Sequence, residues 1–287
     1  MGEVGGYLKK YSISVFFPAF NDGGTIGSMV VMALKTLHEM TDNYEIIIVN
    51  DGSTDYTEQI LNELQKQYAS LKVIHHETNR GYGAALITGF SNCTKDLIFY
   101  TDGDGQYDVR ELSTLLTVFD TKIDWVNGYK ISRSDPLHRK IIGRIYHWIA
   151  KLMFGLRLRD VDCDFRLLRR AMFEKIRLNS SSGVICVEMI KKFQDAGFQF
   201  VEVPVHHYFR AYGKSQFFNY PRIVRIGFQL ISLWVQLVLK RKKIGSQNQD
   251  GWSVKKSFVK SNSTEKLSSS LSCDTENGSS EWKPDPP

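Results

Sequence analysis

The feature that most constrains this fold is an alternation of short apolar runs and helical stretches over the first 127 residues. A strand, a crossover helix and a further strand in this order form a parallel unit of one preferred hand. The sequence therefore predicts an α/β fold built on a doubly wound, mostly parallel sheet. The expected strands are Ile13–Phe17, Glu45–Val49, Lys72–His75, Leu97–Tyr100 and Trp125–Asn127, and the expected helices are Ile26–Met40, Asp55–Tyr68, Gly83–Ser91 and Arg110–Phe119.

The composition agrees with a folded α/β domain that carries appendages. The 287 residues are 42% hydrophobic and 24% charged, which excludes a fully disordered, collagen-like or coiled-coil chain. Uninterrupted apolar runs stay below roughly 18 residues, so a bundle of spanning helices is not expected. The four cysteines are scattered without a Cys-x-x-Cys pair, which favours a reducing compartment over a disulfide framework. The N-terminus lacks the apolar region of a secretory signal, so none is predicted.

The net charge of +6 hides a strong asymmetry along the chain. Residues 129–159 have a net charge of +7 and residues 205–243 one of +8, which leaves −9 for the remainder. Two basic segments on an otherwise acidic chain indicate anionic partners such as nucleic acid, lipid phosphate or an anionic membrane. The basic segments carry no RNP, KH or helix-turn-helix signature, so no nucleic-acid partner is predicted.

Two amphipathic helices are expected within these basic segments. Residues 138–154 place Lys140, Arg144, His147 and Lys151 on a narrow polar stripe, and residues 223–239 repeat the pattern before a run of four cations. Such a helix either covers the sheet or lies in a membrane interface, and the narrow basic face favours the interface. From residue 245 onward the chain is rich in Ser and poor in aliphatic residues, which predicts disorder.

Polar loops follow four of the expected strands. They are Phe17-Pro18-Ala19-Phe20-Asn21-Asp22, Asn50-Asp51-Gly52-Ser53-Thr54-Asp55, Asn79-Arg80-Gly81-Tyr82-Gly83 and Asp102-Gly103-Asp104-Gly105-Gln106. Ligands of such sheets bind at the carboxyl ends of the strands. Asp102 and Asp104 can offer carboxylate oxygens to one hard cation, and Mg²⁺ or Mn²⁺ bound in this way also takes phosphate oxygens from the substrate.

With these loops, residues 12–240 resemble the family 2 glycosyltransferases of the GT-A fold, specifically the dolichyl-phosphate mannose synthases and bacterial polyprenyl-phosphate relatives. The segment 161–170 with Phe165-Arg166, Glu188 and Arg210-x-x-Gly213-x-Ser215 complete the family's order of motifs. Phe20 and Asp22 stand where the family has Tyr and Glu. Gln216 stands where the mannose synthases commonly have Lys, and Lys214 is the expected substitute.

The resemblance implies a role for each of these residues. The donor, a nucleotide sugar, is expected to contact Pro18, Phe20, Asp22, Val49, Asp51, Ser53, Asp102, Gly103 and Lys214. A Mg²⁺ or Mn²⁺ cofactor is expected on Asp102, Asp104 and Gln106, with Asp104 and Arg210 as the catalytic pair. The phosphate of a polyprenyl phosphate acceptor is expected on Lys130, Arg133, Arg144 and Arg166.

The implied reaction is an inverting displacement at the sugar C1 by a phosphate that needs no strong general base. A hydroxyl acceptor would need one, and Asp162 or Asp164 could serve, so a hydroxyl-directed glycosyltransferase remains the alternative. A sugar-nucleotide nucleotidyltransferase is the alternative from another class, although its usual glycine-rich basic loop is missing after the first strand. The glycines of Gly81-x-Gly83 lack the third member of a dinucleotide fingerprint.

The predicted organisation follows from these assignments. Residues 1–11 form an N-terminal arm, and residues 12–220 form the GT-A domain with a nucleotide-sugar half (12–128) and an acceptor half (129–220). Residues 221–243 form a basic helix in the membrane interface, and residues 244–287 form the tail. The enzyme is expected to be peripheral on the cytoplasmic face of a membrane.

Overall fold

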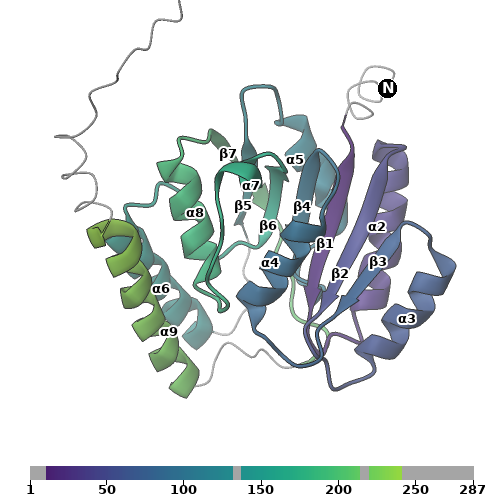
Figure 1. Cartoon of the computed structure of the whole chain (residues 1–287), viewed down its shortest axis with the longest axis horizontal. Coiled ribbons are helices and arrows are strands. Elements are labelled where there is room, and N and C mark those ends of the chain that lie inside the picture. The colour runs from purple at the N-terminus through teal and green to yellow at the C-terminus, as the bar shows by residue number, and fades with distance from the viewer. Residues whose placement is uncertain (1–10, 132–136, 214–219, 241–287) are drawn as a thin grey trace, which may run out of the picture. The chain divides into compact units, whose positions relative to one another are not determined.

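Seven strands form one mixed sheet in the order β3-β2-β1-β4-β6-β5-β7 (Figure 1). The computed structural model describes residues 11–131, 137–213 and 220–240. One strand of the sheet, β6, runs antiparallel to both of its neighbours, and the other pairings are parallel. The strands are β1 (Ile13–Ala19), β2 (Tyr44–Asn50), β3 (Leu71–His75), β4 (Leu97–Thr101), β5 (Trp125–Lys130), β6 (Phe165–Arg169) and β7 (Phe200–Val205).

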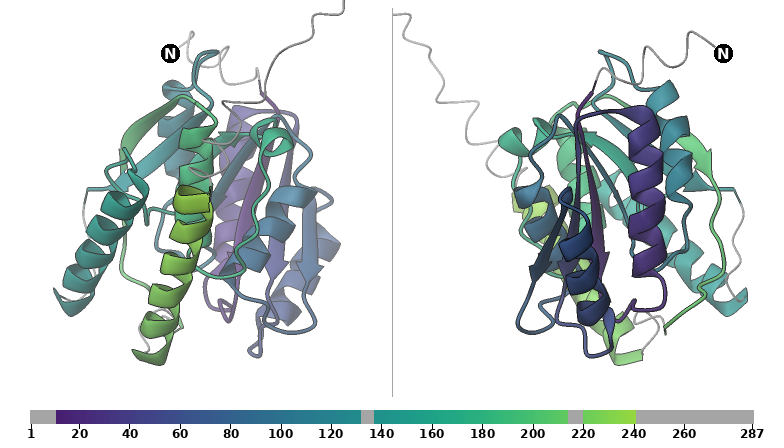
Figure 2. Two further views of the ribbon diagram at one scale, coloured as in Figure 1. Left: turned by 60° about the vertical axis from the view of Figure 1, so that its left-hand side comes forward. Right: turned by 90° about the vertical axis from the view of Figure 1, so that its right-hand side faces the viewer.

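Helices cover both faces of the sheet and create two hydrophobic cores (Figure 2). One core packs α2, α3 and α5 against the sheet, and the other packs α4, α6, α8 and α9. The helices are α2 (Ile26–Met40), α3 (Thr57–Gln67), α4 (Tyr82–Asn92), the 3₁₀ turn η1 (Val109–Glu111), α5 (Leu112–Thr117), α6 (Leu137–Phe154), α7 (Met172–Lys175), α8 (Ile185–Asp195), α9 (Tyr220–Trp234) and the π-helical turn η2 (Val235–Leu239).

The predicted doubly wound, mostly parallel α/β sheet is confirmed. The first four strands and the crossover helices between them lie where the apolar runs placed them, and α2 has the predicted bounds Ile26–Met40. The helix expected over Arg110–Phe119 divides instead into η1 and α5, because the Asp108 side chain caps a short 3₁₀ turn at Arg110. The reversed strand β6 was not predicted.

The pairing of β6 decides which residues stand beside the end of β4. Antiparallel register places Phe165 opposite Thr101, so the residue before β6, Asp164, lies next to the residue after β4, Asp102. Parallel strands end at the same edge of a sheet, and β1, β2, β3 and β4 therefore deliver their loops to this edge as well. A segment from the second half of the chain thus meets the donor loops.

Helices α6 and α9 contact each other at one end of the sheet (Figure 1). Ile226, Leu230 and Leu233 of α9 are buried in the same core as Ala150 and Phe154 of α6. The division of the chain into a catalytic domain and a membrane-interface helix at residues 221–243 stays a prediction. In the structure, one face of α9 packs into the core. Within the described residues, no helix combines the length and the apolar character needed to cross a membrane.

Candidate active site

The loops after β1, β2 and β4 are joined by backbone hydrogen bonds at the carboxyl edge of the sheet. The amide of Asp51 donates to the carbonyl of Ala19 (2.9 Å), and the amide of Gly103 donates to the carbonyl of Pro18 (3.2 Å). Pro18 itself is buried, so it shapes this edge through its carbonyl oxygen. The segment after β7 joins the same edge, where the amide of Tyr208 donates to the carbonyl of Gln106 (2.8 Å).

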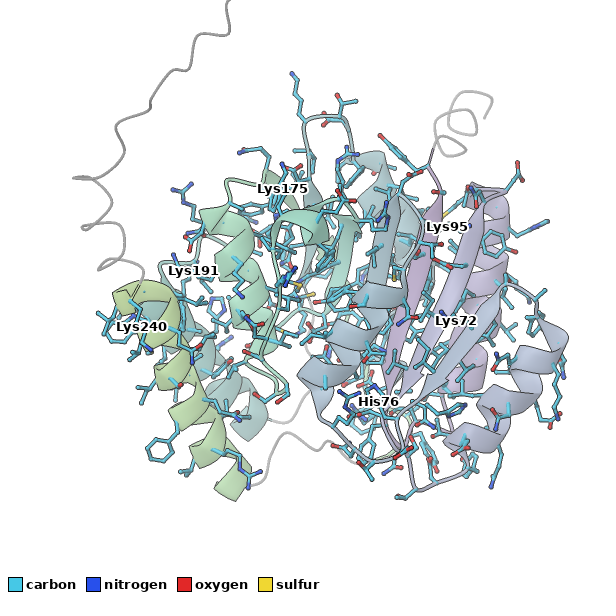
Figure 3. All side chains as sticks on the ribbon, viewed as in Figure 1. Lys72, His76, Lys95, Lys175, Lys191 and Lys240 are labelled. Atoms are coloured by element: carbon cyan, nitrogen blue, oxygen red, sulfur yellow. The ribbon has the colours of Figure 1, made fainter. Side chains whose placement is uncertain are left out.

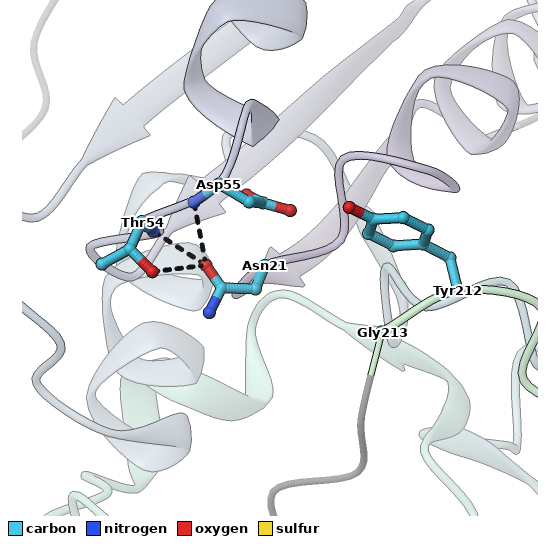
Figure 4. A pocket seen from close by; sticks show the side chains of 5 residues that line it. All are labelled: Asn21, Thr54, Asp55, Tyr212 and Gly213. Atoms are coloured by element: carbon cyan, nitrogen blue, oxygen red, sulfur yellow. Dashed lines mark hydrogen bonds between the residues drawn. The ribbon is translucent and has the colours of Figure 1, made fainter.

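Asn21 ties the first loop to the second (Figure 4). Its φ of 58° turns the chain in the left-handed region that Asn tolerates better than most residues. The Oδ1 atom accepts hydrogen bonds from the amides of Thr54 (2.8 Å) and Asp55 (3.3 Å), and the Asn21 amide donates to the Ser53 hydroxyl (2.9 Å). A hollow of about 430 Å³ opens beside this junction, lined by Asn21, Thr54, Asp55, Tyr212 and Gly213.

Asp51 joins the second loop to the third. Its buried carboxylate accepts hydrogen bonds from the amides of Arg80 (2.9 Å) and Gly81 (2.9 Å) and contacts His76 Nδ1 at 2.6 Å. His76 follows β3 and lies at the end of the sheet where β2 and β3 finish (Figure 3), and its Nε2 lies 3.0 Å from the hydroxyl of Thr88. The predicted donor residue Asp51 therefore also organises the backbone around it.

Asp22, Asp102 and Asp104 form an acidic centre that faces one arginine. Arg210 donates to Asp104 Oδ2 and lies 3.6 Å from Asp22 Oδ1, while Asp102 accepts a hydrogen bond from the Tyr82 hydroxyl at 2.8 Å. The amide of Phe20 donates to Asp22 (3.0 Å), which fixes the bend of the first loop. The predicted pair Asp104 and Arg210 is thus brought together from segments 106 residues apart.

Burial and mutual repulsion raise the pKa values of these carboxyl groups. Burial raises the pKa of Asp22 to about 7, and the charge of Asp104 adds to this shift. The hydrogen bond from the Phe20 amide opposes it. Burial and the charges of Asp164 and Asp104 raise the pKa of Asp102 well above its ordinary value. Burial also raises the pKa of Asp104, although the neighbouring Arg210 opposes the shift. Three carboxyl groups therefore lie near the Arg210 guanidinium, and burial is the main cause of each raised pKa.

This cluster of carboxyl groups fits a divalent cation of the Mg²⁺ type. Within the described residues, no group of three His, Cys, Asp or Glu side chains is arranged to hold a metal by itself. Mg²⁺ is commonly held by one or two carboxylates and completes its shell with substrate phosphates and water. Asp102 and Asp104 supply that number, whereas the Gln106 side chain is turned to the Tyr208 carbonyl (3.1 Å).

Arg166 was predicted to contact the acceptor phosphate, and the structure places it in the interior. Its side chain is 0% exposed. The guanidinium donates to Asn127 Oδ1 (2.7 Å), to the carbonyl of Val161 (2.7 Å), to Asp164 Oδ1 (3.0 Å) and to the hydroxyl of Tyr100. These bonds follow from the register of β6 between β4 and β5, and they make Arg166 a buried structural cation instead of a phosphate ligand.

The other predicted contacts have different outcomes. The Val49 side chain is fully buried in the core, and its contact with the donor stays a prediction. The Lys130 side chain is 9% exposed, and its ammonium donates to the carbonyl of Asp162 (2.6 Å) and lies 4.0 Å from Asp160 Oδ2. Arg144 is exposed on α6. Arg133 and Lys214 lie outside the described residues.

Helices α6 and α9 present large apolar side chains to the outside. Leu152 is 86% exposed, Trp148 67% and Phe228 70%. Neither helix contains an acidic residue, and Arg144 and Arg225 are exposed among these apolar groups. We call this surface the α6/α9 face and define it as Ile141, Arg144, Ile145, Trp148, Ile149, Leu152, Val224, Arg225, Phe228 and Ile231.

Two further side chains, Tyr82 and His76, organise this site. Tyr82 was not assigned a role, and its hydroxyl donates to Asp102 from the start of α4; a tyrosine between two glycines was the available signal. His76 was expected to have a surface or supporting role, and the structure gives it the supporting one by pairing it with Asp51. Its position directly after a predicted strand was the clue.

Comparison with known proteins agrees with this geometry. Over 228 residues, the chain is 26% identical to an undecaprenyl-phosphate 4-deoxy-4-formamido-L-arabinose transferase of Salmonella choleraesuis, an alignment covering 78% of this chain and 67% of that protein. It is 28% identical over 237 residues to glycosyltransferase AglD of Haloferax volcanii, covering 79% of this chain but 38% of AglD.

A solved structure shares the fold at low sequence identity. It is glucosyl-3-phosphoglycerate synthase from Mycobacterium tuberculosis in complex with Mn²⁺, UDP and glucosyl-3-phosphoglycerate, with a TM-score of 0.62 and 18% identity. The match covers 82% of each chain and shows that the sheet and its helices have the GT-A arrangement. The model of "Glycosyl transferase family 2" matches residues 14–177, more than half of the chain. This chain therefore belongs to glycosyl transferase family 2.

Proposed function

We propose that this protein is an inverting glycosyltransferase that moves a sugar from a nucleoside diphosphate sugar to a polyprenyl phosphate at a membrane surface. The observation that carries the proposal is the position of the Asp102, Asp104 and Arg210 centre on the fold that also bears the α6/α9 face. A charged donor needs the acidic centre with Arg210, and a lipid phosphate acceptor needs the α6/α9 face. The formamido-arabinose transferase named above carries an undecaprenyl phosphate in its name, which supports the same acceptor class.

The donor diphosphate is assigned to the acidic centre and Arg210. Asp102 and Asp104 would hold Mg²⁺ or Mn²⁺, and the bound ion would supply charge stabilisation to the departing nucleoside diphosphate. Arg210 lies beside Asp104 and Asp22, and its guanidinium would make a charge-assisted contact with a phosphate oxygen. The loops joined by Asn21 and Asp51 would hold the nucleoside.

The acceptor would attack the sugar C1 from the side opposite the leaving diphosphate. A phosphate monoester is already ionised near neutral pH, so the oxygen that forms the new bond needs no proton removed. The state of Asp164 agrees with this chemistry. Its Oδ1 accepts bonds from Arg166 (3.0 Å), Tyr100 (3.3 Å) and Cys186 (3.2 Å), an arrangement that holds the carboxylate in place instead of presenting it as a base.

The α6/α9 face would bring the enzyme to its lipid acceptor. Apolar side chains that lie among cations, with no acid on either helix, match an interface with anionic headgroups. Arg144 lies within this face and would contact the acceptor phosphate, and Lys130 lies at the end of β5 on the acceptor half. We assign the enzyme to the cytoplasmic side as a peripheral protein.

A direct assay tests the proposal. Purified protein is incubated with Mg²⁺ or Mn²⁺, a panel of labelled UDP and GDP sugars and a short polyprenyl phosphate, and the lipid product is separated. Transfer to the lipid phosphate that is lost in Asp104→Asn supports the proposal. Faster transfer to a sugar hydroxyl would move the protein to hydroxyl-directed glycosyltransferases, and formation of a nucleotide sugar from a sugar phosphate would make it a nucleotidyltransferase.

A further inference from the structure

We infer that Glu188 is a positioning residue of the donor site and acts through the turn Asn179–Ser182, here called the serine turn. The inference rests on the proposed function, because it concerns the loops assigned to the nucleotide sugar. Glu188 lies on α8, its side chain is almost fully buried, and its carboxylate bonds to the serine turn. Its effect on the donor would be indirect.

The carboxylate of Glu188 fixes the backbone of the serine turn. Its Oε1 accepts a hydrogen bond from the amide of Asn179 (3.0 Å), and its Oε2 accepts one from the amide of Ser180 (2.8 Å). Lys192, one helical turn further along α8, donates to Oε1 at 2.6 Å. Hydrogen bonds from two adjacent amides to one ionised carboxylate restrict the orientation of both peptide groups. Glu188 of α8 therefore holds the serine turn in place.

The serine turn in turn holds the start of α4. The first amides of a helix have no partner within the helix. Here the carbonyl of Ser181 accepts hydrogen bonds from the amides of Gly83 (3.0 Å) and Ala84 (3.3 Å). A Cβ atom on Gly83 would lie 2.1 Å from the carbonyl oxygen of Ser180, and one on Gly81 would lie 2.6 Å from that of Ser181.

This contact explains why glycine occupies positions 81 and 83. Gly81 has a φ of 97°, which L side chains rarely adopt, and both glycines let the serine turn approach the α4 backbone. The pair therefore serves close packing between two segments that are about 100 residues apart in sequence. The weak likeness of this motif to a dinucleotide fingerprint has no counterpart in the structure.

The start of α4 carries two contacts into the donor site. The Gly81 amide donates to Asp51 Oδ2 (2.9 Å), and the Tyr82 hydroxyl donates to Asp102 Oδ1 (2.8 Å). Displacement of the serine turn would shift both the second loop and the acidic centre. Glu188 is thus linked to the nucleoside side and to the metal side of the donor site through the same short segment.

The experiment measures donor and acceptor constants separately. Binding of UDP and GDP in the presence of Mn²⁺ is measured by calorimetry for the wild type and Glu188→Gln, and the KM of a short polyprenyl phosphate is measured for both. One charge-assisted hydrogen bond is worth about a factor of ten in binding, so the Kd of the preferred nucleotide should rise roughly tenfold. The acceptor KM should stay unchanged. A merely structural role would lower the fraction of active enzyme and leave both constants as they are.

Asp195→Asn is the matched control. It removes the ion pair with Lys191 (2.6 Å), which has the same spacing on the same helix but does not involve the serine turn. The control should bind nucleotide like the wild type. If Glu188→Gln binds nucleotide within twofold of the wild type, the inference is overturned and the proposed function stands. If the wild type binds neither UDP nor GDP, both the proposed function and the inference are contradicted.

Gly83→Ala tests the same contact from the other side and decides the matter if Glu188→Gln does not fold. Alanine is the better helix former, so without the serine turn this change would be neutral or stabilising for α4. Because the new Cβ would meet the Ser180 carbonyl, we expect the turn to move and the nucleotide Kd to rise at least as much as in Glu188→Gln. An unchanged nucleotide Kd in a folded Gly83→Ala protein contradicts the inference.

Discussion

The proposed donor side and the proposed acceptor side of this molecule are built in opposite ways. On the donor side, Asn21, Asp51 and Asp104 are each held by several hydrogen bonds or an ion pair, and the carboxylates are buried. On the acceptor side, the α6/α9 face is exposed, and its character comes from many apolar side chains and a few cations. The first region therefore offers a ligand a fixed geometry, and the second offers apolar area and positive charge.

This difference predicts how each side responds to substitution. A rigid, hydrogen-bonded site loses most of its function when one partner is removed, because the remaining partners are left buried and unsatisfied. A surface that binds through its total apolar area loses only a small part of its binding free energy when one residue is substituted. Four substitutions, from the largest expected effect to the smallest, test this contrast.

Arg166→Met should have the largest effect, and the effect should be on stability. Arg166 was predicted on the acceptor side but belongs to the rigid interior, where its removal leaves Asp164 without its buried cation. Loss of one partner of a buried ion pair costs about 3–5 kcal/mol in the free energy of unfolding. Urea denaturation measures this loss. Arg170→Met is the control, since its pair with Glu174 at 3.5 Å is exposed and worth below about 1 kcal/mol.

Asp104→Asn should have the next largest effect, now on catalysis. Removal of one group that stabilises developing charge costs about 2.7–4 kcal/mol, or roughly 10²–10³ in kcat/KM. Nucleotide binding should also lose its dependence on Mn²⁺. Asp108→Asn removes a carboxylate four residues away and should behave like the wild type, because Asn still caps η1. Metal-dependent nucleotide binding that survives in Asp104→Asn would contradict the metal assignment.

Arg144→Ala should weaken use of the acceptor while leaving donor binding unchanged. The loss of one charge-assisted phosphate contact costs about 1.5–3 kcal/mol, which is about ten- to hundredfold in kcat/KM for the polyprenyl phosphate. Lys66→Ala removes the same charge from the exposed surface of α3 and serves as the control. If Arg144→Ala uses the lipid phosphate as well as the wild type does, the phosphate lies elsewhere.

Leu152→Ala should have the smallest effect, because it removes one side chain from the α6/α9 face. We expect a loss of about 1–2 kcal/mol in binding to vesicles that contain anionic lipid, with no change in stability. Sedimentation with the vesicles measures it, and Val118→Ala, which shortens an exposed apolar residue after α5, is the control. Equal losses in the two variants would show that the α6/α9 face does not contact lipid.

The local part of this structure could be predicted from sequence, and the long-range part could not. Apolar periodicity located β1 to β4 and gave α2 its bounds, and the position of polar loops after parallel strands placed Asp51 and Asp104 at one edge. The resemblance added Arg210, which the structure brings to Asp104. Each of these inferences depends on neighbours in the chain or on a rule about parallel sheets.

The errors have a common physical cause. Arg166 looks like a surface cation until the antiparallel register places it between Asn127 and Tyr100, and no local pattern encodes that register. The reason for Gly83 lies in a turn about 100 residues away. Sequence patterns report periodicity, whereas these residues depend on which strands become neighbours.

The reversed strand β6 also has a consequence for synthesis of the chain. One edge of β4 stays unpaired until β6 has been made, about 70 residues later, which at about 5–20 residues per second leaves the edge open for several seconds on the ribosome. An open edge of buried, apolar residues is a template for pairing with another chain. We therefore expect a fragment that ends before Phe165 to aggregate more readily than the whole chain.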